Sequence, residues 1–342
     1  MVFTQLLEKQ PPCTKSMPNA AANEELENCP EILHGLSKER GWRTQHLYKY
    51  QNFWCQPQQI QAIVTLQNHF QARQGDIILA TIPKSGTTWL KALTFAITNR
   101  NRFEPTSKVH PLLTSNPHDL VPFLEYKLYA NNQRPDLSCM SSPRIFATHI
   151  PYPSLPESIK FTSGCKIVYL CRNPFDTFVS SWHFITSNNV RSKDTNKLTI
   201  EEAFDMFCEG VVGFGPFWEH MLGYWKMSLS HPEDVMFLKY EDMQDDIQYY
   251  TIKLAKFLGF PFSTEARMTG IIKGITQICS FDNLKDLEVN KKGKSIAEFE
   301  NKTLFRKGKV GDWVNYLSPT MVEKMYMVIE NKLGGSGLTF KV

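Results

Sequence analysis

The alternation of short apolar runs with helical patterns decides the fold class of this chain. Residues 76–81 read Asp-Ile-Ile-Leu-Ala-Thr, which has the length and apolar content of a buried strand, and a helix is predicted from about 88 to 98. Similar runs occupy 144–149, 166–171 and 235–240. Strands that alternate with helices are typical of a parallel sheet. We therefore predict a single α/β domain with a central parallel sheet flanked by helices.

Proline and glycine place several helix ends. Pro174 should begin a helix that continues past Ser181, because proline is favoured in a first helical turn. Another helix is expected after residue 240, through 258, where Gly259 ends it. The residues from 319 to 332 are predicted to form an amphipathic helix, and those from 204 to 225 a buried helix and loop.

Composition supports one folded domain preceded by a tail. The chain has 342 residues, of which 42% are hydrophobic, enough for a sizeable core. No internal repeat and no long low-complexity linker divides it. Residues 1–30, rich in Pro, Asn, Gln, Glu and Ala, are expected to be a flexible tail. Residues 31–342 are expected to form the domain that carries the chemistry.

Charge and cysteine content exclude several classes of protein. The formal net charge is +4 and no Lys/Arg run exceeds two residues, whereas nucleic-acid binders usually carry a denser basic stripe. No stretch approaches the roughly 20 apolar residues of a membrane helix, and no signal-peptide core is found. The eight cysteines include no Cys-x-x-Cys pair, which favours free thiols in the cytoplasm. We expect no metal, nucleic-acid or membrane partner.

The segment between the first strand and its helix has the chemistry of an anion site. Gly86 lets the backbone approach an anion, and the following amides lie at a helix N-terminus whose dipole favours negative charge. Lys84 adds a positive charge, and Ser85, Thr87 and Thr88 add hydroxyl donors. An ordinary turn in which serine and threonine only cap the helix is the alternative.

The lysine of this segment precedes the glycine, unlike that of the Walker loop. The Walker loop of nucleoside-triphosphate enzymes places Gly-Lys-Ser/Thr after a four-residue gap. Such enzymes also need carboxylates for magnesium, and no strand ends in an aspartate suited to that role. A metal-dependent phosphotransferase that shares only the anion site stays open as an alternative, which magnesium dependence would test.

A second segment can bind a phosphate after the strand at 166–171. Arg172 follows that strand, and Ser180 lies eight residues on, about two turns along the next helix. A guanidinium fork and a hydroxyl in this arrangement can contact one phosphate. A surface ion pair between Arg172 and Asp176 is the alternative.

A third segment, Arg-Lys-Gly at 306–308, places two cations before a glycine in a loop that can close over a phosphate. With Pro-Lys-Ser-Gly-Thr-Thr-Trp at 83–89, these segments resemble the soluble sulfotransferases, which use 3′-phosphoadenosine 5′-phosphosulfate (PAPS). The resemblance implies a sulfotransferase domain over 31–342 with a P-loop-like phosphosulfate-binding loop. It implies PAPS as co-substrate, 3′,5′-bisphosphoadenosine (PAP) as product, and no tightly bound cofactor. The residues that it assigns to the donor site are Lys84, Ser85, Gly86, Thr87, Thr88, Trp89, Arg172, Ser180, Tyr240, Cys279, Ser280, Phe281, Arg306, Lys307 and Gly308.

The same resemblance selects His149 among nine histidines as the general base. It stands in Thr-His-x-Pro at 148–151, at the end of a predicted strand. A neutral imidazole can take the proton of an acceptor hydroxyl near pH 7. The implied reaction is in-line sulfuryl transfer, with Lys84 neutralising charge on the departing phosphate oxygen and with no metal.

Within this family the chain is most similar to the plant hydroxyjasmonate sulfotransferases, and more distantly to plant flavonol sulfotransferases. The blocks at 41–44, 116–122 and 213–220 carry this likeness. It implies a small apolar plant metabolite as acceptor, hydroxyjasmonate first, and thus a role in hormone metabolism. A flavonol or a steroid (brassinosteroid) acceptor stays open, as does an inactive nucleotide-binding or scaffold protein.

Some positions depart from the animal members of the family. Ala147 stands where many of them carry a lysine, and Cys279 replaces a threonine, although a thiol is a poor hydrogen-bond donor. The animal dimer motif is represented by Val314, Pro319 and Glu323, of which only the glutamate is retained. We therefore expect a monomer.

The acceptor pocket is the part that the sequence leaves undecided. The aromatic stretches at 116–129 and 204–225 suit an apolar pocket, and they suit a plain core equally well. The carboxylate of a jasmonate acceptor needs a cation, and Lys127, Arg134 and Lys193 are all candidates.

Overall fold

The computed structural model describes residues 32–188, 198–296 and 299–342. The predicted tail at 1–30 lies outside the described residues, and so does Lys193. The strands are β1 (Lys38–Arg40), β2 (His46–Tyr50), β3 (Phe53–Cys55), β4 (Ile77–Ala80), β5 (Ile145–Thr148), β6 (Lys166–Cys171) and β7 (Val235–Lys239). The α-helices are α3 (Pro57–His69), α4 (Thr87–Thr98), α5 (Pro117–Leu120), α6 (Glu157–Phe161), α7 (Pro174–Asn188), α8 (Ile200–Cys208), α9 (Phe217–Ser230), α10 (Tyr240–Asp245), α11 (Ile247–Phe257), α12 (Thr264–Met268), α13 (Ile271–Ile278), α14 (Phe281–Asp286), α15 (Glu288–Lys291) and α16 (Pro319–Leu333).

Four parallel strands form the central sheet, in the order β5-β4-β6-β7. Ala80, the last residue of β4, pairs with Thr148 of β5 and with Tyr169 of β6. These strands therefore end at one edge, and in sheets of this kind ligands bind beyond the carboxyl ends. The predicted α/β domain with a parallel sheet is confirmed, and the four predicted strands are found within one or two residues of their expected ends.

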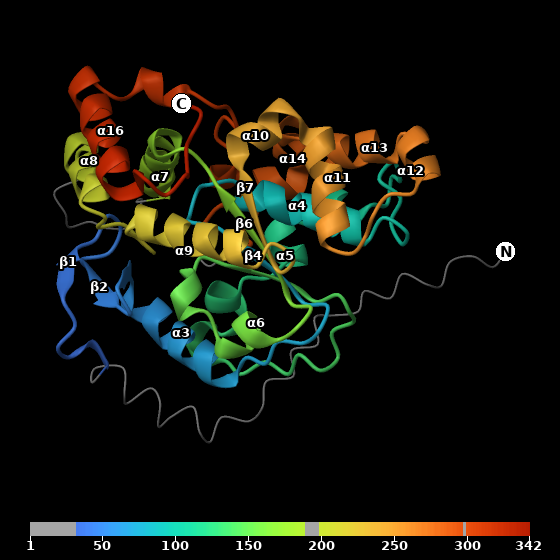
Figure 1. Ribbon diagram of the computed structural model, residues 1–342, viewed down its shortest axis with the longest axis horizontal. Helices are drawn as coiled ribbons and strands as arrows, with labels where there is room; N and C mark the ends of the chain where they lie inside the picture. The colour runs from blue at the N-terminus through green and yellow to red at the C-terminus, as the bar shows by residue number, and fades with distance from the viewer. Residues whose placement is uncertain (1–31, 189–197, 297–298) are drawn as a thin grey trace.

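The strands of the sheet divide their side chains between two apolar cores, because successive residues point to opposite faces. Ile78 and Ala80 face the first core, which α3, α7, α8, α9 and α16 complete. Ile77 and Leu79 face the second, with α4, α11 and α13. In Figure 1, α4, α11 and α13 lie to the right of the sheet and α7, α8 and α16 at the upper left, with α3 below. Both faces are covered, which explains why the strands are apolar throughout.

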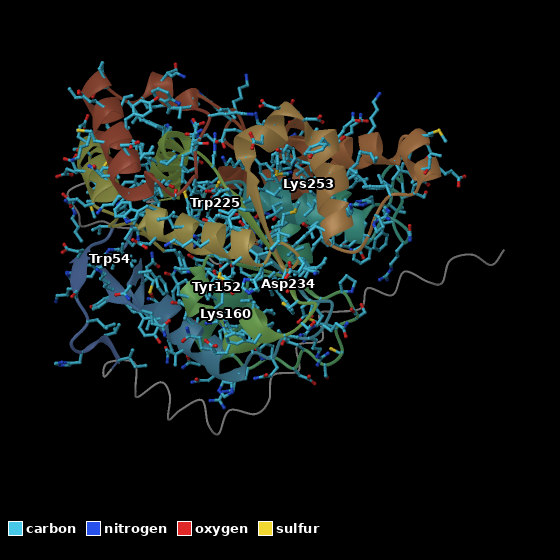
Figure 2. The ribbon with its side chains drawn as sticks, in the orientation of Figure 1. Trp54, Tyr152, Lys160, Trp225, Asp234 and Lys253 are labelled. Atoms are coloured by element: carbon cyan, nitrogen blue, oxygen red, sulfur yellow. The ribbon has the colours of Figure 1, made fainter. Side chains whose placement is uncertain are left out.

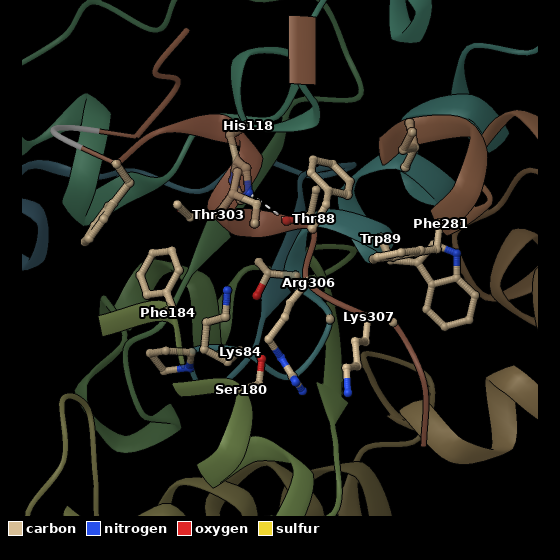
Figure 3. Close-up of a pocket in the computed structure, with 18 of the residues that line it drawn as sticks. Lys84, Thr88, Trp89, His118, Ser180, Phe184, Phe281, Thr303, Arg306 and Lys307 are labelled. Atoms are coloured by element: carbon tan, nitrogen blue, oxygen red, sulfur yellow. Dashed lines mark hydrogen bonds between the residues drawn. The ribbon is translucent and has the colours of Figure 1, made fainter. Parts of the chain in front are cut away.

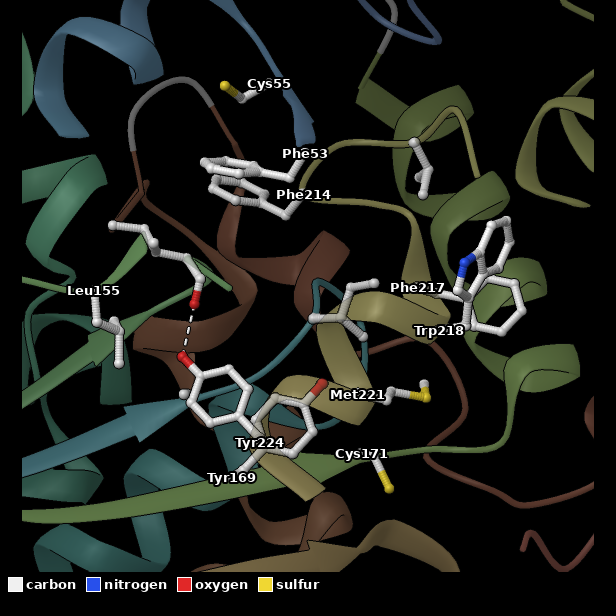
Figure 4. Close-up of a cluster of buried hydrophobic side chains, with 14 of the residues drawn as sticks. Phe53, Cys55, Leu155, Tyr169, Cys171, Phe214, Phe217, Trp218, Met221 and Tyr224 are labelled. Carbon is white, nitrogen blue, oxygen red and sulfur yellow. Dashed lines mark hydrogen bonds between the residues drawn. The ribbon is translucent and has the colours of Figure 1, made fainter. Parts of the chain in front are cut away.

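Aromatic side chains dominate the first core. Trp225 of α9 packs edge-on against Phe237 of β7, with ring centroids 5.1 Å apart (Figure 2). Tyr169 and Tyr224 stack at 4.3 Å, and Tyr224 donates a hydrogen bond to the main-chain oxygen of Ile150 at 2.6 Å (Figure 4). Buried phenols of this kind need a hydrogen-bond partner, and here it fixes the chain just after β5.

A buried ion pair ties the starts of β4 and β5 together. Arg144 Nε donates to Asp76 Oδ1 at 2.8 Å, a second nitrogen contacts Oδ2, and both side chains are almost completely buried. Asp76 Oδ2 also accepts from the main-chain nitrogen of Arg73 at 2.8 Å. Removing one partner would leave an uncompensated buried charge, so the pair holds the two strands in register at the edge away from their carboxyl ends.

A small antiparallel sheet, β1-β2-β3, precedes the central sheet and was not expected from the sequence. It is tied to the loop after α8, where Trp54 donates its main-chain N–H to Gly215 at 2.9 Å. Phe53 and Phe214 also stack there, with ring centroids 6.1 Å apart (Figure 4). β1 is charged and exposed throughout, and β2 mixes polar with apolar residues, so neither has the continuous apolar run that identified the central strands.

Two expectations about helices have different outcomes. The helix expected from 240 through 258 is wrong, because the structure has two helices, α10 and α11, that meet at Asp246. Asp246 has a non-helical backbone and caps α11 by accepting from Tyr249 N at 2.9 Å. The Asp246 side chain accepts from a main-chain N–H in place of the carbonyl of a continuous helix, which explains the break. Gly259 follows the end of α11 with φ of +83°, as expected for a glycine past a helix C-terminus.

No helix among the described residues is long and apolar enough to cross a membrane. Within the described ranges Cys55, Cys165, Cys171, Cys208 and Cys279 are free thiols, in agreement with the expectation.

Candidate active site

A cavity of about 1200 Å³ lies at the carboxyl ends of the parallel strands. The segments that follow β4, β5, β6 and β7 all contribute to its wall, together with the loop after 304. Every residue that the sequence assigned to the site lines this cavity except Ser85. These lining residues are Lys84, Gly86, Thr87, Thr88, Trp89, His149, Arg172, Ser180, Tyr240, Cys279, Ser280, Phe281, Arg306, Lys307 and Gly308.

The phosphate loop, residues 81–89, has a strained backbone that aims its groups into the cavity. Lys84 adopts φ of +70°, which a non-glycine residue rarely does. Gly86 has φ of +107°, and a Cβ there would lie 2.8 Å from Tyr240 Cδ2. Only glycine fits this position, and α4 begins at the next residue, Thr87. The loop therefore presents a helix N-terminus to the cavity, where an anion is favoured.

Lys84 is the cation at the centre of the loop. Its Nζ lies 3.9 Å from the centroid of the Phe184 ring. Enclosure in the wall, and then the positive charges of Arg172 and Arg306, lower the pKa of Lys84 to about 7. In Figure 3 the ends of Lys84, Ser180, Arg306 and Lys307 gather in one region below Thr88. An anion bound between Lys84, Arg172 and Arg306 would reduce the repulsion among them.

Unsatisfied polar atoms mark where that anion would bind. Within the described part of the chain, Ser85 Oγ, Arg172 Nε and Arg306 Nε are buried and have no hydrogen-bond partner. Each belongs to one of the three segments that the sequence assigned to phosphates. A buried donor without a partner costs about 1–3 kcal/mol, so these three groups fit a ligand that carries phosphate or sulfate oxygens.

Arg172 makes the ion pair that the sequence offered as an alternative to phosphate binding. Its Nη2 lies 3.3 Å from Asp176 Oδ2, and both side chains are buried. The ion pair does not use every donor of the guanidinium, because Nε has no hydrogen-bond partner among the described residues. Its Cζ lies 4.7 Å from the centroid of the Tyr240 ring. Arg172 and Ser180 both line the cavity, so the ion pair with Asp176 is present and phosphate binding by Arg172 stays a prediction.

Asp176 also holds the loop that carries the third cation pair. Its Oδ2 accepts from Gly311 N at 2.8 Å and its Oδ1 from Trp313 N at 3.2 Å. On the loop itself, Asp312 bonds both Arg306 Nη1 and, at 2.6 Å, Lys307 Nζ. Burial acts to raise the pKa of Asp312, and the hydrogen bonds from Lys307 and Arg306 lower it to about 2.

Aromatic side chains form the other end of the donor side. Trp89 meets Tyr240 edge-on, with centroids 5.3 Å apart, and Figure 3 shows Trp89 and Phe281 at the end of the cavity away from Lys84. A Cβ on Gly308 would lie 2.5 Å from Phe281 Cδ2, so glycine allows the loop to close over this ring. Tyr240 Oη donates to the main-chain oxygen of Gly308 at 3.0 Å. A flat base fits between such rings.

His149 is held in one tautomer at the end of β5. Its Nδ1 lies 2.7 Å from the main-chain oxygen of Thr81, which can only accept, so Nδ1 carries the proton. Nε2 is therefore the basic nitrogen. His220 Nε2 donates to the main-chain oxygen of His149 at 2.8 Å, and Tyr169 Oη donates to His220 Nδ1 at 2.8 Å. This chain of hydrogen bonds from the core fixes the backbone that carries the imidazole.

Burial keeps the imidazole of His149 neutral. Burial, with smaller contributions from the charges of Lys91 and Lys84, lowers its pKa to about 3, although the hydrogen bond to Thr81 opposes this. Glu125 Oε1 accepts from the main-chain nitrogen of His149 at 2.7 Å. Burial raises the pKa of this carboxyl to about 7. A neutral histidine with a free Nε2 in a cavity can act as a general base.

One face of the cavity beside His149 is aromatic. The His149 ring lies 4.8 Å from that of Phe123 and 5.9 Å from that of Tyr126, centroid to centroid. Both line the cavity, and both belong to the first of the two stretches that the sequence left undecided. No residue of the second stretch, 204–225, lines the described cavity. Its large side chains form the first apolar core, so core packing explains that stretch.

Two of the three cations that the sequence proposed for an acceptor carboxylate, Lys127 and Arg134, do not line this cavity. Lys127 is partly exposed and pairs with Asp119 at 2.9 Å, and Arg134 lies elsewhere on the chain. Arg43 lines the cavity instead, with its Cζ 4.3 Å from the centroid of the Phe299 ring. Burial and then Glu125 raise the pKa of the Tyr126 phenol, and the charge of Arg43 opposes both. The sequence offered only the block at 41–44 as a signal.

Among the described residues, no group of three or more His, Cys, Asp or Glu side chains is arranged to hold a metal ion.

Comparisons with known proteins agree with this site. A sequence model of the sulfotransferase domain matches residues 74–337. Cytosolic sulfotransferase 15 of Arabidopsis thaliana is 59% identical over 333 residues, which cover 96% of this chain and 92% of that protein. Cytosolic sulfotransferase 14 of the same plant is 58% identical over 316 residues, covering 91% and 90%.

Solved structures give the same result. A putative steroid sulphotransferase of Arabidopsis thaliana superposes with a TM-score of 0.74 at 39% identity, covering 95% of this chain and all of that one. A mouse sulfotransferase complexed with PAP superposes with a TM-score of 0.64 at 25% identity, covering 85% and 95%. Matches over nearly the whole chain show the family, and the PAP bound to the mouse enzyme agrees with PAPS as the co-substrate. The chain belongs to the plant cytosolic sulfotransferase family and is a PAPS-dependent sulfotransferase.

Proposed function

We propose that this enzyme transfers the sulfuryl group of PAPS in line to the hydroxyl of hydroxyjasmonate. The observation that supports the proposal is that one cavity contains a neutral imidazole whose Nδ1 carries the proton, His149, and a cation in the loop after the neighbouring strand β4, Lys84. In the reaction, Nε2 takes the proton of the acceptor hydroxyl as its oxygen bonds to sulfur. The bond between sulfur and the phosphate oxygen breaks, and Lys84 stabilises the charge on that oxygen.

The donor side of the cavity is proposed to bind PAPS through two anion sites. Residues 84–88 hold the 5′-phosphosulfate, because the loop joins an unpaired buried hydroxyl to a helix N-terminus. Arg172, Ser180 and Arg306, with Lys307 and Gly308, hold the 3′-phosphate, because each guanidinium has an unpaired Nε. The adenine lies between the rings at the far end. The residues proposed to surround the adenine are Trp89, Tyr240, Cys279, Ser280 and Phe281.

The acceptor is proposed to lie along the aromatic face and to meet Arg43 with its carboxylate. Phe123 and Tyr126 offer an apolar wall beside His149, suited to a small hydrocarbon ring and chain. A cation at the far side of this wall favours an acceptor with a carboxylate over a neutral one. This arrangement supports hydroxyjasmonate, whose hydroxyl and carboxylate lie at different ends of one apolar molecule.

We also propose that the enzyme is a cytoplasmic monomer whose domain spans 31–342. The Arabidopsis relatives are named cytosolic sulfotransferases. At the C-terminal surface Val314 is exposed and Pro319 begins α16. A proline has no main-chain N–H to pair across an interface. Sedimentation at micromolar concentration should give a single species of the monomer mass, and a dimer would contradict this part.

A competition assay tests the acceptor. Purified enzyme with labelled PAPS receives hydroxyjasmonate, a flavonol and a brassinosteroid together at equal concentration. We expect most of the label in hydroxyjasmonate sulfate. Predominant labelling of the flavonol or the steroid would overturn the acceptor and leave the enzyme class intact.

Two controls test the reaction itself. Sulfation should continue in excess chelator, because cations of the protein neutralise the phosphates, whereas loss of activity would favour a metal-dependent mechanism. Binding of PAP without sulfation of any compound in a broad hydroxylated library would favour an inactive nucleotide-binding protein.

A further inference from the structure

Lys91 is a buried lysine for which the reaction described above has no use. It lies on α4 with its side chain completely buried, between Leu90 and Ala92 of the second apolar core. Among the described residues no salt bridge to its Nζ is found; Glu125 and Asp119 act on it only through their charges, and burial lowers the pKa of Lys91 well below its usual value. Burial of an ammonium group without a partner of opposite charge is strongly unfavourable, so the fold alone does not explain a lysine here.

The contacts of Lys91 lead from the core to the cavity. Its Nζ lies 2.8 Å from His118 Nδ1 and 3.3 Å from the centroid of the Phe123 ring. His118 stacks on the same ring, with centroids 5.3 Å apart and planes 14° from parallel. On its other side, His118 Nε2 lies 2.9 Å from Thr88 Oγ1, the bond drawn in Figure 3. Thr88 and His118 both line the cavity.

The chemistry of the three groups gives the hydrogen bonds a direction. Burial lowers the pKa of Lys91 well below its usual value, but the amine keeps N–H donors whether it is charged or neutral, and it donates to His118 Nδ1. The proton of the neutral imidazole is then on Nε2, which donates to Thr88 Oγ1. The hydroxyl of Thr88 has accepted one bond and keeps its own proton for a ligand in the cavity. His118 is fixed in this position because its main-chain nitrogen donates to Asn116 Oδ1 at 2.9 Å.

We propose that Lys91 and His118 are positioning residues that turn the hydroxyl of Thr88 into a hydrogen-bond donor for the 5′-phosphosulfate end of PAPS. This inference rests on the proposed donor site. The amine of Lys91 is the first donor behind the phosphate loop, and a bound anion in front of the loop favours its positively charged form. The relay carries part of that attraction through two hydrogen bonds, which strengthen one another in a medium of low dielectric.

A double-mutant cycle on the affinity for PAP tests the relay. Thr88→Val keeps the shape of the side chain and removes the hydroxyl, and Lys91→Met keeps its length and removes the donor. Each change should weaken PAP binding about tenfold, as measured by calorimetry, because Thr88→Val removes the donor to a charged phosphate and Lys91→Met removes the bond that orients it. In the double variant the loss should stay at about tenfold, since Lys91 acts only through Thr88. A hundredfold loss would mean independent effects and would overturn the relay.

Two further variants separate the relay from a structural role. His118→Phe keeps the ring stacked on Phe123 without its nitrogens, and it should weaken PAP binding as much as Lys91→Met does. Thr94→Val is the matched control for Thr88→Val, because Thr94 is buried on the same helix and its Oγ1 has no partner within the described residues. It should change PAP affinity less than twofold.

Thermal unfolding separates the relay from a purely structural role of Lys91, because the two predict opposite changes in melting temperature. Lys91→Met should raise the melting temperature while it weakens PAP binding, because it removes a buried cation that the fold does not neutralise. A lowered melting temperature with unchanged PAP affinity would overturn the proposal. If the wild-type protein binds no PAP, the proposed donor site is refuted. Failure of the relay alone would appear only in the variants.

Discussion

The imidazole of His149 donates from Nδ1 to the main-chain oxygen of Thr81 at 2.7 Å. Thr81 follows the last residue of β4 and His149 the last residue of β5, and these two strands are neighbours in the sheet. Thr81 Oγ1 in turn contacts Thr87 Oγ1 at 2.7 Å, at the start of α4. One hydrogen bond thus couples the orientation of the base to the loop that holds the transferred group.

Replacement of His149 by asparagine should separate catalysis from binding. The amide can still donate to the Thr81 oxygen, and Nε2, the basic atom, is lost. We expect kcat to fall by about 10²–10⁴, the usual contribution of a general base, while the Kd for PAP changes less than twofold. Steady-state kinetics and calorimetry measure the two. Residual activity within tenfold of the wild type would show that another group takes the proton.

The affinity for PAP should depend on the protonation of Lys84. Its pKa in the free enzyme is about 7, and a bound phosphate favours the charged form and raises that pKa. Affinity should therefore fall as the pH rises from 7 to 9, by up to about tenfold per unit, with proton uptake on binding. Lys84→Met should bind weakly and lose this slope. Lys307→Met, the matched control on the same cavity, should bind weakly with the slope retained.

Arg43 should determine the preference for a carboxylate acceptor. Arg43→Gln should raise KM for hydroxyjasmonate about 10- to 100-fold, the worth of a charge-assisted hydrogen bond, and leave KM for its methyl ester within threefold. Lys127→Gln, which removes a surface cation outside the cavity, should leave both values unchanged. Equal effects of Arg43→Gln on the acid and its ester would contradict the assignment.

Glu125 should make the enzyme less stable as the pH rises. Burial raises the folded-state pKa of this carboxyl from 4.5 to about 7. Its stabilising contribution is therefore complete below pH 4.5 and is lost as the pH rises through 7. Across this pH window the free energy of unfolding of Glu125→Gln should rise above that of the wild type by up to about 3 kcal/mol, as measured by denaturant unfolding. Glu219→Gln, at an exposed site, should give a curve parallel to the wild type.

The loop over the adenine end should not tolerate a side chain at Gly308. An alanine Cβ would lie 2.5 Å from Phe281, so Gly308→Ala should raise KM for PAPS at least tenfold. Gly311→Ala is the control, because its φ of +81° is similar and a Cβ there would meet nothing within 4 Å. It carries only the backbone strain of about 1 kcal/mol. Equal effects of the two variants would mean that backbone strain explains the higher KM for PAPS and that a clash with Phe281 does not.

Much of the donor side could be predicted from the sequence because its residues stand in short contiguous segments. Within 83–89, and within 306–308, the local backbone keeps neighbouring residues close together. The first segment follows a strand and the second lies in a loop. Strands buried on both faces are apolar at every position, so they could be recognised without knowing their neighbours. The short antiparallel strands and the break at Asp246 lacked such a signal.

The acceptor side could not be predicted in the same way. Lys127 and Arg43 are equally charged in the sequence, and only the fold puts Lys127 on the surface beside Asp119 and Arg43 in the cavity wall. Likewise, the stretches at 116–129 and 204–225 have similar aromatic content, and packing assigns the first partly to the cavity and the second to the core.

The sequence by itself determined the parallel sheet and indicated the phosphate loop, because periodicity and adjacent residues are local properties of a chain, and the resemblance to the sulfotransferases selected His149. The tertiary structure alone decided which distant groups meet. It placed Lys91 against His118, 27 positions apart, and directed that pair at Thr88 of the phosphate loop. Long-range contacts of this kind depend on how helices pack against the sheet, and burial then changes the charge and hydrogen bonding of the groups that they bring together.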